Sequence, residues 1–111
     1  MAKHASMIIE GDSMEPTYSA GDWLMGRWAN YKLTGLNRIK VGDVIVIERD
    51  EQPGIFYVKR ISEISSTKGE TPTLYLLSDN PAGTDSRTWG WIPGNEIVGI
   101  VRMRVKKSRV N

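Results

Sequence analysis

The chain has 111 residues, with 15 Lys and Arg against 13 Asp and Glu and a formal net charge of +2. That length suits one small domain, and 40% hydrophobic with 25% charged residues is a globular composition, not a disordered one. The absence of cysteine excludes disulfide scaffolds, thiolate metal sites and cysteine nucleophiles. We expect a single domain over residues 1–111, with a basic C-terminal tail over residues 102–111.

The apolar stretches are short. The longest aliphatic run, residues 44–47, is far below the roughly 20 residues that cross a bilayer. The N-terminus lacks the apolar region of about 7 to 15 residues that a signal peptide needs. The sequence therefore predicts a soluble, cytoplasmic protein with no membrane span; membrane association through an anchor outside this chain is the alternative.

The predicted elements are mostly extended. β-Branched and aromatic runs predict strands over residues 23–27, 43–48, 54–61, 73–77 and 96–105, and at most a short helical turn after Ser13. Residues 49–54 are typical of a turn, residues 63–72 of a hairpin loop, and residues 28–40 of a loop that packs Tyr31 and Leu36 over the sheet. Many short strands separated by Gly and Pro predict an all-β (mainly β) fold, a compact β-barrel or packed antiparallel sheets.

Ser13 is the first candidate for chemistry. Residues 11–17 (GDSMEPT) place it at a sharp turn that exposes a hydroxyl beside backbone N–H groups, as a nucleophile next to an oxyanion hole requires. Ser and Asp also make turn hydrogen bonds that have no catalytic role. The only histidine, His4, lies in a segment that we expect to fray, which argues against a histidine triad.

Lys59 is the other base available to Ser13. In an extended strand it shares a face with Ile55, Tyr57 and Ile61. A lysine is protonated at neutral pH unless burial lowers its pKa, by up to about 3 to 5 units in an apolar site. Two interpretations stay open on this segment alone: a buried, neutral amine that deprotonates the serine, or a half-buried lysine whose amine extends into solvent.

The third polar segment, residues 78–87 (SDNPAGTDSR), is dense in turn-forming residues. We expect an ordered loop that braces a site and in which Asp85 and Arg87 form an ion pair. Asp79 and Asp85, without His or Cys nearby, are weak evidence for a metal site. We therefore predict neither a metal nor another cofactor.

In this order, the three segments resemble the signal peptidase I family of serine endopeptidases, which use a Ser/Lys dyad. Residues 11–17 resemble the family's nucleophile box, residues 41–46 (VGDVIV) its following strand box, residues 57–61 (YVKRI) its lysine box, and residues 79–80 with 85–87 its last box. Four matches in register over residues 10–101 favour the dyad over the alternatives left open above.

The resemblance implies a role for each matching residue. Ser13 is expected to be the nucleophile, Lys59 the general base and the Ser13 backbone N–H an oxyanion donor. An extended substrate is expected to lie along strand edges and to be cut after small residues. The implied site residues are the catalytic Ser13 and Lys59; Gly11, Asp12, Met14 and Pro16 in the nucleophile turn; and Asp79, Asn80, Thr84, Asp85, Ser86 and Arg87 in a supporting loop.

The chain departs from the family pattern in two boxes. Gly11 stands where some relatives have a serine that contributes a side-chain oxyanion donor, so the oxyanion hole is expected to rest on backbone groups. In the last box, Ser78 stands where glycine is usual, and the serine that hydrogen-bonds the catalytic lysine is matched by Gly83 or Thr84. Thr84 is the candidate substitute for orienting Lys59.

The resemblance also points to a substrate. Lys59 and Ser78 are only 19 positions apart, which leaves no space for the second domain that many relatives insert there. That spacing, with residues 79–87 and residues 89–93 (WGWIP), is similar to the short soluble members described as nickel-type superoxide dismutase maturation proteases. The implied partner is a protein with an N-terminal leader peptide, the nickel superoxide dismutase precursor, and no nucleic acid.

Two other functions are alternatives. A self-cleaving regulator of the LexA or UmuD type uses a similar dyad but needs a cleavable arm, and only 12 residues precede Ser13. A non-enzymatic β-barrel module would bind nucleic acid with Trp23, Trp28, Trp89 and Trp91 as stacking platforms. The charge of −3 over residues 1–101, from 10 basic and 13 acidic residues, opposes that second alternative.

Overall fold

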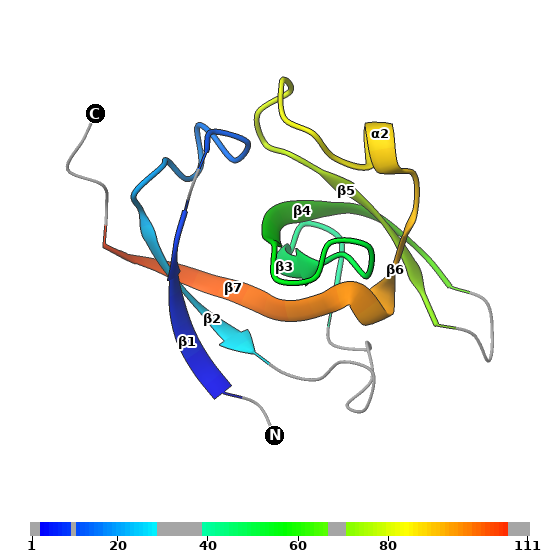
Figure 1. Ribbon diagram of the computed structural model, residues 1–111, viewed down its shortest axis with the longest axis horizontal. Coiled ribbons are helices and arrows are strands. Elements are labelled where there is room, and N and C mark those ends of the chain that lie inside the picture. The colour runs from blue at the N-terminus through cyan, green and yellow to red at the C-terminus, as the bar shows by residue number, and fades with distance from the viewer. Residues whose placement is uncertain (1–2, 10, 29–38, 67–70, 107–111) are drawn as a thin grey trace.

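The computed structural model describes residues 3–9, 11–28, 39–66 and 71–106 (Figure 1). Its seven strands form one antiparallel sheet in the order β1-β2-β7-β3-β4-β5-β6, which confirms the predicted all-β class. The strands are β1 (Lys3–Ile8), β2 (Trp23–Trp28), β3 (Val44–Glu48), β4 (Phe56–Ser65), β5 (Thr73–Leu77), β6 (Ile92–Pro93) and β7 (Ile97–Lys106); helix α2 (Ser86–Trp89) and the 3-10 turn η1 (Gly94–Glu96) lie between β5 and β7.

Strand β3 lies at the middle of the sheet and is buried on both faces. Successive side chains of a strand point to opposite faces, so Ile45 and Ile47 enter one apolar cluster while Val44 and Val46 enter another. The Ile45 cluster contains Ile39, Ile45, Ile47, Ile61, Leu74, Leu76, Ile92, Ile97 and Ile100. The Val46 cluster contains Ile9, Met14, Leu24, Val44, Val46, Val58 and Val101. Burial on both faces explains why residues 44–47 are a continuous aliphatic run.

The five predicted strands are present with changes at their ends, the largest in β4, and β1 and β6 are additional strands. Residues 63–65, predicted as loop, continue β4 because they pair with β5, Glu63 opposite Tyr75 and Ile64 opposite Leu74. The N-terminal segment, predicted to fray, forms β1 because all six of its residues pair with β2. The extension of β4 and the formation of β1 both depend on pairing between distant segments, which local sequence patterns do not predict.

Several short elements were not predicted, and some predictions lie outside the described residues. Helix α2, strand β6 and turn η1 have four, two and three residues, too few to show a hydrophobic period. The predicted packing of Tyr31 and Leu36 and the last five residues of the basic tail fall on parts of the chain that the structure does not describe. Within the described part of the chain, no helix has the length and apolar character needed to cross a membrane.

Two strand edges in the described part of the sheet, one of β1 and one of the first half of β4, have no partner strand. β1 is the first strand of the sheet and pairs with β2. β4 pairs with β3 over residues 56–60, but its register with β5 begins only at Arg60. Among the described strands, none pairs with the outer edge of β1 or with the second edge of residues 57–59. A groove lies between these two edges.

We expect Gly26→Ala to destabilise the protein by about 1–3 kcal/mol, the usual cost of overpacking. A Cβ on Gly26 would lie 2.6 Å from the backbone oxygen of Ile100 on β7, and backbone atoms of a central strand cannot move aside cheaply. Urea denaturation measures the change. Val105→Ala, at an exposed position of β7, is the control and changes stability by less than about 0.5 kcal/mol.

Candidate active site

Ser13 lies on a compact turn that follows β1. The Glu15 N–H donates to the Asp12 carbonyl at 3.1 Å, and the Tyr18 N–H donates to the Met14 carbonyl at 2.9 Å, so hydrogen-bonded turns, and no helix, follow Ser13. Met14 is 2% exposed and packs in the Val46 cluster, which anchors the turn to the core. The half-buried serine thus stands beside a fixed residue, and its position depends on the core.

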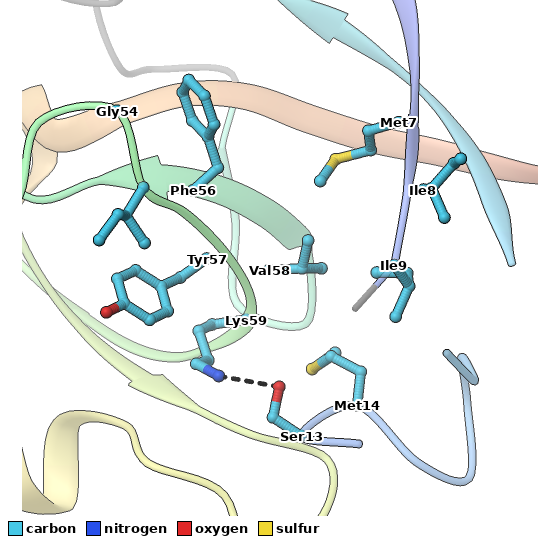
Figure 2. Close-up of a pocket in the computed structure, with 11 residues that line it drawn as sticks. Met7, Ile8, Ile9, Ser13, Met14, Gly54, Phe56, Tyr57, Val58 and Lys59 are labelled. Carbon is cyan, nitrogen blue, oxygen red and sulfur yellow. Dashed lines mark hydrogen bonds between the residues drawn. The ribbon is translucent and has the colours of Figure 1, made fainter. Parts of the chain in front are cut away.

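Lys59 approaches Ser13 from the middle of β4. Its Nζ lies 3.0 Å from the Ser13 Oγ, although 46 positions separate the two residues in the chain (Figure 2). The alternation of β4 sends Val58 into the Val46 cluster and Ile61 into the Ile45 cluster, with Tyr57 packed against the latter. Lys59 therefore shares the face of Tyr57 and Ile61, as the sequence predicted, and is only 3% exposed.

Burial sets the electrostatics of the amine. Removal from water lowers the pKa of Lys59 below its ordinary value, because an ammonium loses more hydration energy than a neutral amine. The negative charge of Asp85 raises the pKa, but its effect is smaller than that of burial. Of the two interpretations that the sequence left open, the structure supports the buried amine and not the one that extends into solvent.

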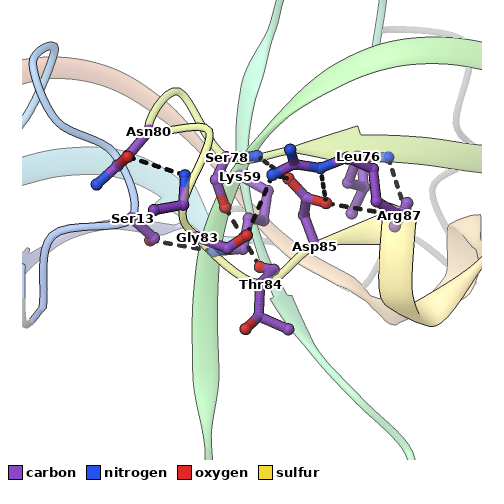
Figure 3. Close-up of polar contacts among 11 residues, drawn as sticks. Ser13, Lys59, Leu76, Ser78, Asn80, Gly83, Thr84, Asp85 and Arg87 are labelled. Atoms are coloured by element: carbon purple, nitrogen blue, oxygen red, sulfur yellow. Dashed lines mark hydrogen bonds and ion pairs between the residues drawn. The ribbon is translucent and has the colours of Figure 1, made fainter.

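A loop between β5 and α2 holds the serine turn from the other side (Figure 3). The Asn80 N–H donates to the Ser13 carbonyl at 2.8 Å, and the Asn80 side-chain amide donates to the Asp12 carbonyl at 3.0 Å. The Asn80 carboxamide oxygen accepts from the Ala82 N–H at 3.0 Å, which fixes the side chain's orientation. The loop therefore braces the serine turn through one asparagine, which donates hydrogen bonds to two successive carbonyls of that turn.

Gly83 allows this loop to approach the serine closely. A Cβ at Gly83 would lie 3.0 Å from the Ser13 Cβ and 2.6 Å from the Ser78 Oγ. The Ser78 hydroxyl donates to the Thr84 carbonyl at 3.2 Å. Thr84 itself has an exposed side chain, and its backbone is the part that takes part in this contact. The expectation that Thr84 orients Lys59 receives no support from this placement.

Asp85 is the buried acceptor that organises the loop. Its carboxylate is 1% exposed and accepts from the Ser78 N–H at 2.7 Å and from the backbone and guanidinium of Arg87 at 2.9–3.0 Å. Burial raises the pKa of Asp85, but the hydrogen bonds from Arg87 and Ser78 outweigh burial and lower it. The predicted ion pair with Arg87 is present. Ser86 is buried beside it, and its Oγ accepts from the Leu76 N–H at 2.9 Å.

A second ion pair ties the loop to β4 next to Lys59. The Nε and Nη2 of Arg60 donate to the Asp79 carboxylate at 2.9 and 2.8 Å, and Nη1 donates to the Gly42 carbonyl at 2.8 Å. The hydrogen bond from Arg60 lowers the pKa of Asp79. A bidentate pair has a defined geometry. Arg60 and Asp79 therefore hold β4 and the loop in a fixed relative position.

A groove of about 420 Å³ leads to the serine and the lysine. Met7, Ile8 and Ile9 line one side and residues 54–58 the other, with Ser13, Met14 and Lys59 at one end (Figure 2). These are the two strand edges described above. The walls are mainly apolar, and Lys59 supplies the one basic side chain among the lining residues of this groove.

The other predicted residues of the turn are more peripheral. Gly11, Asp12 and Pro16 are exposed, and Gly11 has φ of +75°, a left-handed conformation that favours glycine over the serine found in some relatives. Ile55, expected on the apolar face of Lys59, is 49% exposed at the rim of the groove. The structure brings together Ser13, Lys59 and the loop of residues 78–87. Four exposed residues lie at the edge of that site: Gly11, Asp12, Pro16 and Ile55.

Comparison with known proteins identifies the family. A family model described as signal peptidase, peptidase S26, matches residues 1–70, which is 70 of the 111 residues. The match contains Ser13 and Lys59 and ends before the loop that begins at Ser78. No curated protein matches the chain.

We expect Asp85→Asn to destabilise the protein at pH 7 by about 1–3 kcal/mol, because an amide leaves donors of Ser78 or Arg87 unpaired. The lowered pKa of Asp85 means that the carboxylate stabilises the fold above its unfolded pKa, and that this contribution is lost as the pH falls through the folded pKa. The deficit of the variant should therefore shrink in acid. Urea denaturation across pH 2–7 tests this, with the exposed Asp50→Asn as control.

Proposed function

Because this chain belongs to the signal peptidase family, peptidase S26, we propose that it is a serine endopeptidase in which Ser13 is the nucleophile and Lys59 the general base. The observation that carries the proposal is the 3.0 Å contact between the Ser13 hydroxyl and an amine that is almost fully buried. A nucleophilic hydroxyl needs an adjacent base, and burial gives this lysine the lowered pKa that the role requires.

The first half of the reaction forms an acyl-enzyme. The Ser13 Oγ attacks the scissile carbonyl carbon while its proton passes to the lone pair of the neutral Lys59 amine. The resulting oxyanion accepts a hydrogen bond from the Ser13 backbone N–H. When the tetrahedral intermediate collapses, the C–N bond breaks and the Lys59 ammonium returns its proton to the leaving amine. The mature chain leaves with the new amine, and the leader, which carries the scissile carbonyl, stays bound to Ser13 as an ester.

The second half restores the enzyme. A water molecule gives a proton to the neutral Lys59 amine as its oxygen attacks the ester carbonyl, and a second tetrahedral intermediate forms. Its collapse breaks the bond to the Ser13 Oγ, which takes the proton back from the lysine, and the carboxylic acid leaves. One lysine serves both halves because its amine alternates between base and acid.

The groove suits an extended peptide. An added strand pairs its backbone with exposed edges of a sheet, and its alternate side chains enter pockets. The edges of β1 and of residues 57–59 are available for this pairing, and both border the groove. Met14, which is buried beside Ser13, limits the space at the end of the groove. This arrangement supports cleavage after small residues, in a leader or signal-type peptide.

The specific substrate proposed here is the precursor of a nickel superoxide dismutase. Its support is the resemblance of residues 79–87 and 89–93 to the short maturation proteases and the close spacing of Lys59 and Ser78. A synthetic peptide that spans the precursor's leader junction tests it directly: cleavage at that junction supports the assignment. If the protein cleaves general signal-type peptides but not the precursor junction, this substrate is rejected and the proposed peptidase activity still stands.

We expect Ser13→Ala and Lys59→Met to reduce turnover of a peptide with small residues before the scissile bond by about 10³-fold or more, because nucleophile and base act as one unit. Mass spectrometry of the products measures cleavage and its position. Ser19→Ala, a serine on the same turn that bonds Glu15, is the matched control and keeps activity. Near-normal turnover in Lys59→Met would show that another group is the base.

We expect kcat/KM to rise with pH through the lowered pKa of Lys59, because only the neutral amine accepts the proton. The same burial has a cost in stability. Since the unfolded lysine binds a proton that the folded one holds less tightly, Lys59→Met should stabilise the protein, with a Tm increase of about 4–8 °C for each 1 kcal/mol gained. The gain should be largest in acid and shrink as the pH rises toward the unfolded pKa. A variant less stable than the parent at every pH would contradict a costly buried amine.

A further inference from the structure

The Lys59 amine has two aromatic neighbours in addition to Ser13. Its Nζ lies 5.8 Å from the centre of the Tyr57 ring and 5.9 Å from the centre of the Trp89 ring. The two rings meet edge to face, with centroids 5.1 Å apart and planes at 64°. A ring within about 6 Å attracts an amine when the amine is charged, but the ring also excludes water from that side, which favours the neutral amine. Tyr57 and Trp89 thus form an aromatic wall of the Lys59 site.

Trp89 reaches this wall from a different part of the chain. It is the last residue of α2, and its N–H donates to the carbonyl of Asp85, the N-cap, at 3.0 Å. Tyr57, by contrast, shares β4 with the lysine and is held by a 2.8 Å bond from its hydroxyl to Gln52. The placement of Trp89 relative to Lys59 therefore depends on tertiary contacts and not on the geometry of β4.

Arg49 supplies one of these contacts. Its Cζ lies 5.2 Å from the centre of the Trp89 ring. Its Nε donates to the Glu96 carboxylate at 2.9 Å, and the same carboxylate accepts from the Asp50 N–H at 3.2 Å. Only 12% of the Arg49 side chain and 5% of the Glu96 side chain are exposed. The guanidinium therefore lies over the indole while a largely buried ion pair holds it, and Glu96 offsets its positive charge.

On the basis of the proposed function, we infer that Trp89 is a positioning residue for Lys59. Together with Tyr57, its ring confines the amine to the conformation that meets the Ser13 hydroxyl and keeps water from it. The Arg49–Glu96 ion pair holds Trp89 in place, so the turn after β3 and the 3-10 turn η1 support the base at a distance. Asp85 is the carboxylate whose charge reaches Lys59, and none of the variants below changes it.

The test compares Trp89→Leu, Trp89→Phe and Arg49→Met with the parent protein. Trp91→Leu is the matched control, because Trp91 makes the same kind of edge-to-face pair, with Tyr75 at 5.4 Å and 61°, two residues along the chain. Two readouts are needed: kcat and KM for a cleaved peptide across pH, and the ¹³Cε resonance of Lys59 against pH, assigned by its absence in Lys59→Met. The second readout requires no catalysis.

We expect Trp89→Leu to lower kcat by about 10-fold or more with little change in KM, since misplacing a reacting group by about 1 Å costs up to about 100-fold. The Lys59 titration and the acid limb of the pH–rate profile should both move to higher pH, because the amine becomes hydrated. Trp89→Phe should recover most of the loss. Arg49→Met should shift both readouts in the same direction by a smaller amount, and Trp91→Leu should shift neither.

The inference is overturned if Trp89→Leu and Arg49→Met alter only Tm, or only KM, and leave the Lys59 titration at its parental pH. If Trp89→Leu does not fold, Arg49→Met decides the question by the same two readouts. Absence of peptidase activity in the parent protein would remove the proposed function. A Lys59 titration that still moved in Trp89→Leu would then retain the aromatic wall as the feature that sets the state of this amine.

Discussion

The structure depends on keeping one amine out of water beside one hydroxyl. Burial of Lys59 is unfavourable for stability, because the charged form loses its hydration. The fold supplies what that burial needs: the apolar strand β3 paired with β4 at Lys59, a serine turn anchored by Met14, and aromatic rings against the amine. A surface lysine would be protonated at neutral pH and could accept no proton. Because the buried amine lies beside the serine hydroxyl, we interpret the groove as a substrate site and the loop as its support.

Polar contacts do at the site what apolar packing does in the core. The turn that carries Ser13 and the loop of residues 78–85 are far apart in the chain. Asn80 joins them by bonding two carbonyls of the turn, and the Arg60–Asp79 pair joins the loop to β4. Asp85 then fixes the loop to α2. Each of these bonds has a defined direction, so together they set the serine's position more narrowly than packing alone.

The site is assembled from the whole sheet, which explains how so short a chain can hold it. Ser13 follows β1 at one edge, Lys59 lies on β4, and Trp89 follows β5 near the other edge. Figure 1 shows the turn after β1 and the loop after β5 at the same end of the molecule. Curvature of one antiparallel sheet brings them together and leaves the edges of β1 and β4 facing a groove. The same curvature that builds the core therefore forms the proposed substrate channel.

The sequence by itself determined the class of fold, the strands with strong β patterns and the face of β4 that carries Lys59, because these follow from local alternation of side chains. It also singled out Ser13, Lys59 and the 78–87 loop through their resemblance to four family boxes. Only the tertiary structure decided that the amine is buried, that Asn80 clamps the turn, that Thr84 faces outward and that Trp89 stands against Lys59. These depend on contacts between residues 30 to 68 positions apart in the chain, from Lys59 and Trp89 to Asp12 and Asn80. They also depend on how the two faces of a curved sheet are filled, which no local pattern records.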